Sequence, residues 1–168
     1  VLTPKNTVLV EVTGFASHPD CRPVVAGKNI YFAAERAEYT TIKEYYNVQQ
    51  VSDVLNAQDI TSHVPSYIPN GVHTIIPNTA ENLMLFQTAG DDNSLYIYKY
   101  LFVNENRVQS SWSKWEFTGS IIGAEFFGSE LHLITLHAND RVTMERVLFT
   151  YNTKDFDDEP YRIFLDRK

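Results

Sequence analysis

Three neighbouring residues near the N-terminus have the side chains of a nucleophilic site. His18, Asp20 and Cys21 supply a base, a carboxylate and a thiol within four positions. Partners in such sites normally meet through the fold, whereas these are neighbours in a loop that contains Pro19. We therefore expect an ordinary turn here. Because Cys21 is the only cysteine, the sequence also excludes an internal disulfide and a multi-cysteine zinc site.

Other metal-ligating residue types occur, but their spacing does not favour a metal site. His132 and His137 stand five positions apart in a predicted strand, so their side chains face opposite sides. The acidic stretches at 91–93 and 155–159 lack the spaced oxygen ligands, turn glycine and distal Glu of a calcium loop. We expect solvated turns there. The sequence predicts no metal and no cofactor.

Carboxylates also offer one route to an enzyme. A suitably spaced pair among Glu116, Glu125 and Glu130 would suffice for glycoside hydrolysis, although the sequence gives no distance between them. The chain has no Gly-rich phosphate loop, Gly-x-Ser-x-Gly elbow or His-Glu-x-x-His motif. We therefore predict a protein that is not an enzyme. A cell-wall (peptidoglycan or glycan) hydrolase, or a glycan-binding module, is kept as the alternative.

An aromatic stripe provides a possible sugar-binding surface. The residues of 95–103 alternate, so that Tyr96, Tyr98, Tyr100 and Phe102 share one face of a strand. Leu95, Ile97, Leu101 and Val103 fill the other face, which predicts a strand buried on both sides. Packing between sheets is favoured over sugar stacking. Trp112 and Trp115 face opposite sides of their strand and are expected to be packing anchors, although a lectin-like module is a further alternative.

The elements that would position these residues are mainly strands. Aromatic residues make up 13% of the chain, and short runs of Val, Ile, Thr, Tyr and Phe alternate with Asn, Asp, Gly and Pro clusters. Strands are predicted at 7–12, 29–35, 39–46, 72–76, 83–88, 95–103, 110–118, 121–127, 131–136 and 142–151. One segment differs: at 53–69 we expect a short helix capped by Asp59 and limited by Pro65 and Pro69.

A weak internal repeat organises the strands. Segments that begin at Asn29, Asn82 and Glu130 each contain an apolar strand, a polar turn and a longer strand, at the spacing of roughly 40–50 residues expected for four-stranded propeller blades. The sequence thus predicts an all-β fold: a partial β-propeller of about three blades, at 1–52, 70–119 and 120–168, with the helical insert at 53–69. A β-sandwich is the alternative. Three blades cannot close a ring, so we expect further sequence or partner chains to cover the open edges.

The charge and hydropathy of the chain argue against a tight nucleic-acid binder and against a membrane-spanning protein. Fourteen Lys and Arg against 21 Asp and Glu give a formal net charge of −7, which disfavours tight binding to nucleic acid. The apolar stretch 95–103 is broken by Lys99 and is far shorter than the roughly 20 residues of a membrane helix. We expect no stable membrane insertion.

Two stretches resemble the nozzle proteins, also called tail tubular protein B, of T-seven-like short-tailed bacteriophages. They are AERAEYTTIKEYYNVQQVSDVLNAQDITSHVPSYIPNGV at 34–72 and SSWSKWEFTGSIIGAEF at 110–126. The family's proteins are several times longer, so the resemblance implies that this chain is an interior portion. It further implies a virion structural protein of the phage tail, with six copies in a ring beneath an adaptor (tail tubular protein A), tail fibres nearby and double-stranded DNA passing through the lumen.

The resemblance also suggests roles for the charge and for the insert. An acidic wall would repel the phosphate backbone and keep moving DNA from adhering. The insert is either a contact with a neighbouring subunit or domain, or a simple connector between blades. Its candidate contact residues are Asp59, Ile60, Thr61, His63, Val64, Pro65 and Tyr67.

Overall fold

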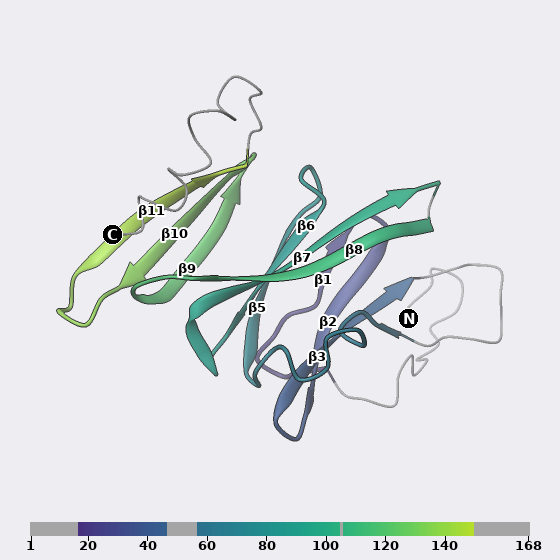
Figure 1. The fold of residues 1–168 in the computed structure, drawn as a ribbon, viewed down its shortest axis with the longest axis horizontal. Helices are drawn as coiled ribbons and strands as arrows, with labels where there is room; N and C mark the ends of the chain where they lie inside the picture. The colour runs from purple at the N-terminus through teal and green to yellow at the C-terminus, as the bar shows by residue number, and fades with distance from the viewer. Residues whose placement is uncertain (1–16, 47–56, 105, 150–168) are drawn as a thin grey trace, which may run out of the picture.

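The protein is all-β in the residues that the structure, a computed structural model, describes, namely 17–46, 57–104 and 106–149 of 168. These residues form three antiparallel sheets, and no helix occurs among them (Figure 1). Within the same residues, no helix has the length and apolar character needed to cross a membrane. The prediction of an all-β chain is confirmed.

The first sheet runs in chain order from β1 to β4. Its strands are β1 (Val24–Ala26), β2 (Asn29–Arg36), β3 (Tyr39–Tyr46) and β4 (Gln58–Asp59). A two-residue turn joins β1 to β2, and Gly27 adopts a positive φ of 63° there, which a residue without Cβ tolerates at no steric cost. The sequence did not predict β1 or β4, because strands of three and two residues depend on the neighbours with which they pair.

The second sheet is also a four-stranded meander. It contains β5 (Val72–Asn78), β6 (Leu83–Thr88), β7 (Asp91–Val103) and β8 (Asn106–Glu116). The β6 strand pairs with β7 only as far as Lys99, while β7 and β8 remain paired to Val103 and Asn106. The last part of β7 and the first part of β8 therefore form a two-stranded ribbon that extends beyond β6.

The third sheet completes the described part of the chain. Its strands are β9 (Ser120–Phe127), β10 (Glu130–Leu136) and β11 (Val142–Leu148), again joined in chain order. Burial alternates along β10, so Leu131 and Leu133 face inward and are fully buried while Ile134 and Leu136 are exposed. This sheet therefore has one apolar face available for packing.

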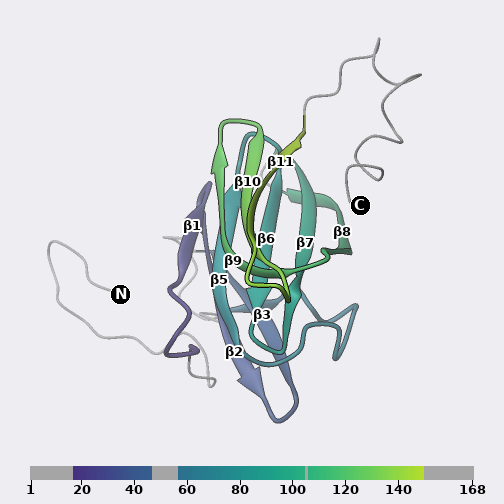
Figure 2. The ribbon, with the colours of Figure 1, turned by 90° about the vertical axis from the view of Figure 1, so that its left-hand side faces the viewer.

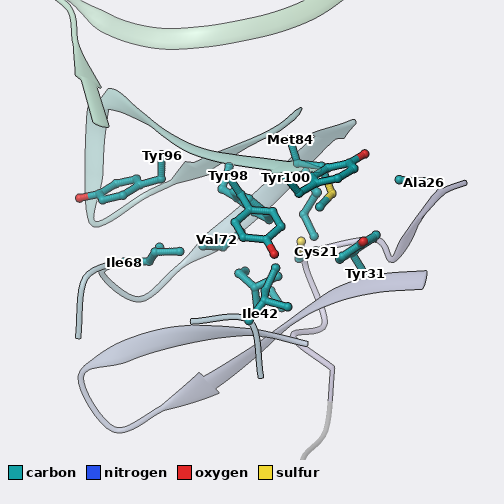
Figure 3. Packing of buried hydrophobic residues seen from close by; sticks show 14 residues of the cluster. Cys21, Ala26, Tyr31, Ile42, Ile68, Val72, Met84, Tyr96, Tyr98 and Tyr100 are labelled. Atoms are coloured by element: carbon teal, nitrogen blue, oxygen red, sulfur yellow. The ribbon is translucent and has the colours of Figure 1, made fainter. Parts of the chain in front are cut away.

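The three sheets stack so that the second lies between the other two (Figures 1 and 2). One face of the second sheet joins the first sheet in an aromatic cluster, which includes Tyr31, Tyr96, Tyr98 and Tyr100 (Figure 3). Its other face joins the third sheet in an aliphatic cluster, which includes Leu83, Leu85, Leu95, Ile97, Leu131 and Leu133. The alternation in β7 places the tyrosines on one side and the aliphatic residues on the other.

The strand contacts show how the stack is oriented. The first strand of the second sheet, β5, contacts both β1 and β9, which are the first strands of the other two sheets. The last strands, β4, β8 and β11, make no comparable contacts with one another in the described residues. The third strand of the second sheet, β7, also contacts β9. Side chains of β8 reach both neighbouring sheets, so the sheets pack over their faces as well as along their first strands.

Two expectations are corrected by the fold. The described part of the expected helical insert, 57–69, contains β4 followed by turns, because Pro65 restricts the backbone and Ser66 adopts a positive φ of 60°. Leu101 and Val103 were expected to fill a buried face but are 44% and 48% exposed, because they lie on the ribbon beyond β6. The predicted strand at 7–12, residues 53–56 of the insert and the end of the strand at 142–151 lie outside the described residues.

Candidate functional site

The residues His18, Asp20 and Cys21 do not form a nucleophilic site. The chain turns at 19–21 as expected, and His18 Nε2 lies 2.7 Å from Glu35 Oε1 while its Nδ1 accepts the Asp20 backbone N–H at 3.2 Å. Cys21 is 2% exposed, and burial raises the pKa of its thiol to about 11. The thiol is therefore protonated at neutral pH and is a poor nucleophile.

The two histidines of the third sheet have separate partners. His132 Nε2 lies 3.3 Å from Glu130 Oε2, and His137 Nε2 lies 2.8 Å from Thr143 Oγ1. His137 also lines an open pocket with Asp92 and Asp140. In the described ranges, no group of three or more His, Cys, Asp or Glu side chains is arranged to hold a metal ion.

The three carboxylates considered for hydrolysis lie on different strands. Glu116 on β8 pairs with Lys114 at 2.5 Å, while Glu130 on β10 lies 3.7 Å from Arg146 in addition to His132. Glu125 on β9 is exposed and accepts the Phe126 backbone N–H at 3.2 Å. Glu116 and Glu130 thus have cationic partners, and Glu125 has a local backbone partner.

The acidic turn at 91–93 is only partly solvated. Asp92 and Asn93 are exposed, but Asp91 begins β7 and accepts hydrogen bonds from Tyr96 Oη at 2.8 Å and Ser94 Oγ at 3.0 Å. Burial opposes ionisation of Asp91, yet these bonds and the charge of Lys114 lower its pKa overall. The expectation of a solvated turn is therefore wrong for Asp91, and the stretch 155–159 lies outside the described residues.

The aromatic stripe is buried rather than available to a sugar. Tyr96, Tyr98 and Tyr100 are 3%, 1% and 7% exposed. Trp112 packs on the same side, with its ring centroid 4.8 Å from that of Tyr98. Trp115 lies in the aliphatic cluster and stacks on Phe149 with a centroid separation of 5.5 Å. The two tryptophans thus face opposite sheets.

The main polar feature between the first two sheets was not predicted from the sequence. Glu44 on β3 is 7% exposed, and its Oε1 accepts hydrogen bonds from Tyr31 Oη at 2.6 Å and Asn29 Nδ2 at 2.7 Å. Its Oε2 accepts from Arg107 Nη1 on β8 at 2.5 Å. This pair joins residues 63 positions apart. The available signal was that Glu44 shares the inward face of β3 with Ile42, where a charge needs a buried partner.

The segment after β4 lies against the last strand of the second sheet. Asp59 Oδ1 accepts the backbone N–H of Thr61 at 2.9 Å, so the predicted cap stabilises a turn instead of a helix. Trp112 Nε1 on β8 donates to the carbonyl of Ile60 at 3.1 Å. Ile60 and Thr61 are buried, Val64 and Tyr67 are half-buried, and His63 and Pro65 are exposed. Only part of the predicted contact segment therefore reaches the surface.

Comparison with known proteins identifies the family. The sequence profile of the bacteriophage nozzle protein family matches residues 1–168. The chain belongs to this family. It is also 41% identical over 169 aligned residues to the protein named tail tubular protein gp12 of Escherichia phage T7, which covers 99% of this chain and 21% of that relative. The chain thus spans about a fifth of the relative's length. Nozzle proteins are structural components of the phage tail and not enzymes, so this chain belongs to the virion tail.

Proposed function

We propose that this chain is a structural segment of a tail nozzle through which phage DNA leaves the virion and enters the host cell. The observation that carries the proposal is the nozzle-family match over the whole chain, supported by 41% identity to a tail tubular protein. In this role no residue performs chemistry. The segment acts through the shape of its sheets, through packing against other parts of the tail and through its surface charge.

The arrangement of the sheets supports a β-propeller as the architecture. Consecutive antiparallel meanders that stack face to face, with β5 in contact with both β1 and β9, are what an arc of propeller blades requires. The blades would be those predicted at 1–52, 70–119 and 120–168, with the first extended to residue 59 because β4 pairs with β3. A two-sheet sandwich would leave one face of the second sheet in solvent, whereas here both of its faces are packed. The rest of the same polypeptide would supply the remaining blades.

The tail context supplies the expected partners. A nozzle needs several copies around a lumen, and we propose a hexameric ring that joins the adaptor, tail tubular protein A, and lies near the tail fibres. The exposed residues of the segment after β4, including His63 and Pro65, contribute to a contact with a neighbouring subunit or domain.

The net charge suits contact with moving DNA. At −7 the chain repels phosphates, so DNA passes without being held. The expected result for the assembled nozzle is no retention of double-stranded DNA at physiological salt. Retention that weakens steeply as salt rises would instead indicate a basic lumen and would contradict this part of the proposal.

A complementation experiment tests the proposed function. Phage particles made without their nozzle protein would be mixed with the full-length polypeptide that carries these residues, and tails would be counted by electron microscopy alongside DNA delivery to cells. We expect both complete tails and delivery to depend on the added protein. Complete tails and normal delivery in its absence would contradict the proposal.

A further inference from the structure

The outer edge of β8 is a long strand edge without a partner in the described part of the chain. The strand order of the second sheet ends at β8, which pairs with β7 on one side only. From Val108 to Ser113 every side chain is exposed except that of Trp112, which is half-buried. The backbone N–H and C=O groups along such an edge can pair with another strand.

This edge lacks the features that usually prevent strand pairing. The sequence VQSSWS at 108–113 contains no charge, proline or glycine. The other described edges are short or interrupted: β1 and β4 have three and two residues, β5 contains Pro77, and β11 carries Glu145 and Arg146. The pairing of β9 with β10 shifts register once, and the pairing of β8 with β7 also shifts once, at Val108, so the uninterrupted part of the β8 edge is 109–113. Among the described edges, β8 is therefore the one best suited to pair with another strand.

The β8 edge is also held in place before any partner binds. Arg107 pairs with the buried Glu44 of the first sheet, and the indole of Trp112 donates to the Ile60 carbonyl. Tyr100 and Phe102 of the adjacent strand pack in the aromatic cluster. An edge that is already ordered loses little conformational entropy when a strand adds to it.

The position and charge of the edge indicate what binds there. The two faces of the second sheet are covered by the first and third sheets, and its first strand contacts β1 and β9. Side chains of the first and third sheets contact the two faces of β8, but among the described residues neither sheet pairs with its outer backbone edge. Copies of a chain with a net charge of −7 repel one another, and an uncharged edge is where two of them meet with least repulsion.

We propose that residues 109–113 of β8 pair, through their backbone, with an edge strand of a second copy of the nozzle polypeptide. The inference rests on the proposed assembly of copies in the tail and names the contact that joins them. The partner is recognised by an exposed strand edge, in the manner of strand addition to a sheet.

The test measures thiol labelling in the full-length nozzle polypeptide. Ser111→Cys places a thiol on the edge, and Ala138→Cys places one in the exposed β10–β11 turn as the matched control. Each variant is labelled with a maleimide as a dilute monomer and as the assembled oligomer, with the unsubstituted polypeptide as background. Strand pairing should slow labelling at position 111 by about tenfold or more on assembly and leave position 138 unchanged.

A second variant tests the same contact without a thiol. Ser111→Lys adds an edge charge and should raise the concentration needed for half-assembly about tenfold, whereas Ala138→Lys should not. The melting temperature of the monomer should be the same for both. Equal labelling of position 111 in monomer and oligomer, or protection already in the monomer, would overturn the inference while leaving the nozzle assignment intact. A wild-type polypeptide that never oligomerises would overturn both.

Discussion

The two interfaces of the second sheet differ in their chemistry. Toward the first sheet, tyrosines pack around a buried ion pair, and three donors converge on Glu44. Toward the third sheet, the centre of the contact consists of leucine and isoleucine side chains. The contrast is clearest along β7, whose odd and even residues carry different side-chain types, and residues of β5 and β6 also contribute to both clusters.

The difference indicates different roles for the two interfaces. Aliphatic burial is strong but not directional, so it holds the second and third sheets together without fixing their relative position by itself. Hydrogen bonds to a buried carboxylate require one geometry, and a missing partner leaves an unsatisfied charge. We therefore expect the aromatic interface to specify how the first two sheets are placed, and the aliphatic interface to contribute mainly through area.

The largest effect should come from removing an aromatic ring at the first interface. Phe86 is fully buried, and its ring centroid lies 5.3 Å from that of Trp112. Phe86→Ala should lower the free energy of unfolding by about 3–5 kcal/mol through lost burial and a cavity. Urea denaturation measures this change. A loss below about 1 kcal/mol would show that the aromatic interface is not well packed.

The corresponding test of the aliphatic interface removes Leu133, which is fully buried on β10. Leu133→Ala should lower the free energy of unfolding by about 2–4 kcal/mol. Because the third sheet contacts the second mainly through this cluster, amide hydrogen exchange should accelerate most in β9–β11. Acceleration spread evenly over the first sheet would contradict the separation of the two interfaces.

The Glu44–Arg107 ion pair provides a test of whether the aromatic interface fixes the relative position of the first two sheets. Arg107→Met keeps most of the side-chain volume but leaves Glu44 buried without its cation, which should lower the free energy of unfolding by about 2–3 kcal/mol. Adding Glu44→Gln should recover part of that loss, because the unpaired charge is removed. A double-mutant cycle with no coupling would show that the pair does not join the sheets.

A smaller effect on the free energy of unfolding should come from Asp91, at the edge of the aromatic interface, and should depend on pH. The pKa of Asp91 is lowered in the folded protein, so its contribution to stability is present above the unfolded value of about 3.9 and is lost as pH falls through the lower folded value. Asp91→Asn should therefore reduce the decline in stability as pH falls below the unfolded value. Denaturation curves at several pH values measure this, and an unchanged decline would rule out the proposed contribution.

Strands with a local sequence pattern could be predicted from the sequence. The polar contact between the first two sheets could not. Alternation over 95–103 predicted β7, and a short apolar run at 83–88 between turn-forming residues predicted β6, because both signals lie within a few neighbouring residues. The alternation of β3 places Glu44 on an inward face, but β4 and the Arg107 partner of Glu44 depend on residues distant in sequence, which a local pattern does not reveal. The cap at Asp59 was recognised, but turn chemistry and Pro65 determined a turn instead of a helix.

Burial at the ends of elements was also beyond sequence reasoning. Leu101 continues the apolar face of Leu95 and Ile97, yet it is exposed because β6 ends before it. The pattern predicts which side of a strand a residue faces, but not whether another sheet extends far enough to cover it.

The most direct test of the account is a cryo-EM reconstruction of the assembled full-length nozzle. We predict three adjacent blades in which β1, β5 and β9 lie closest to the propeller axis, while the edge of β8 lies at the perimeter and meets a second copy. A reconstruction in which these sheets do not form adjacent blades, or in which β8 faces the propeller axis, would contradict the account.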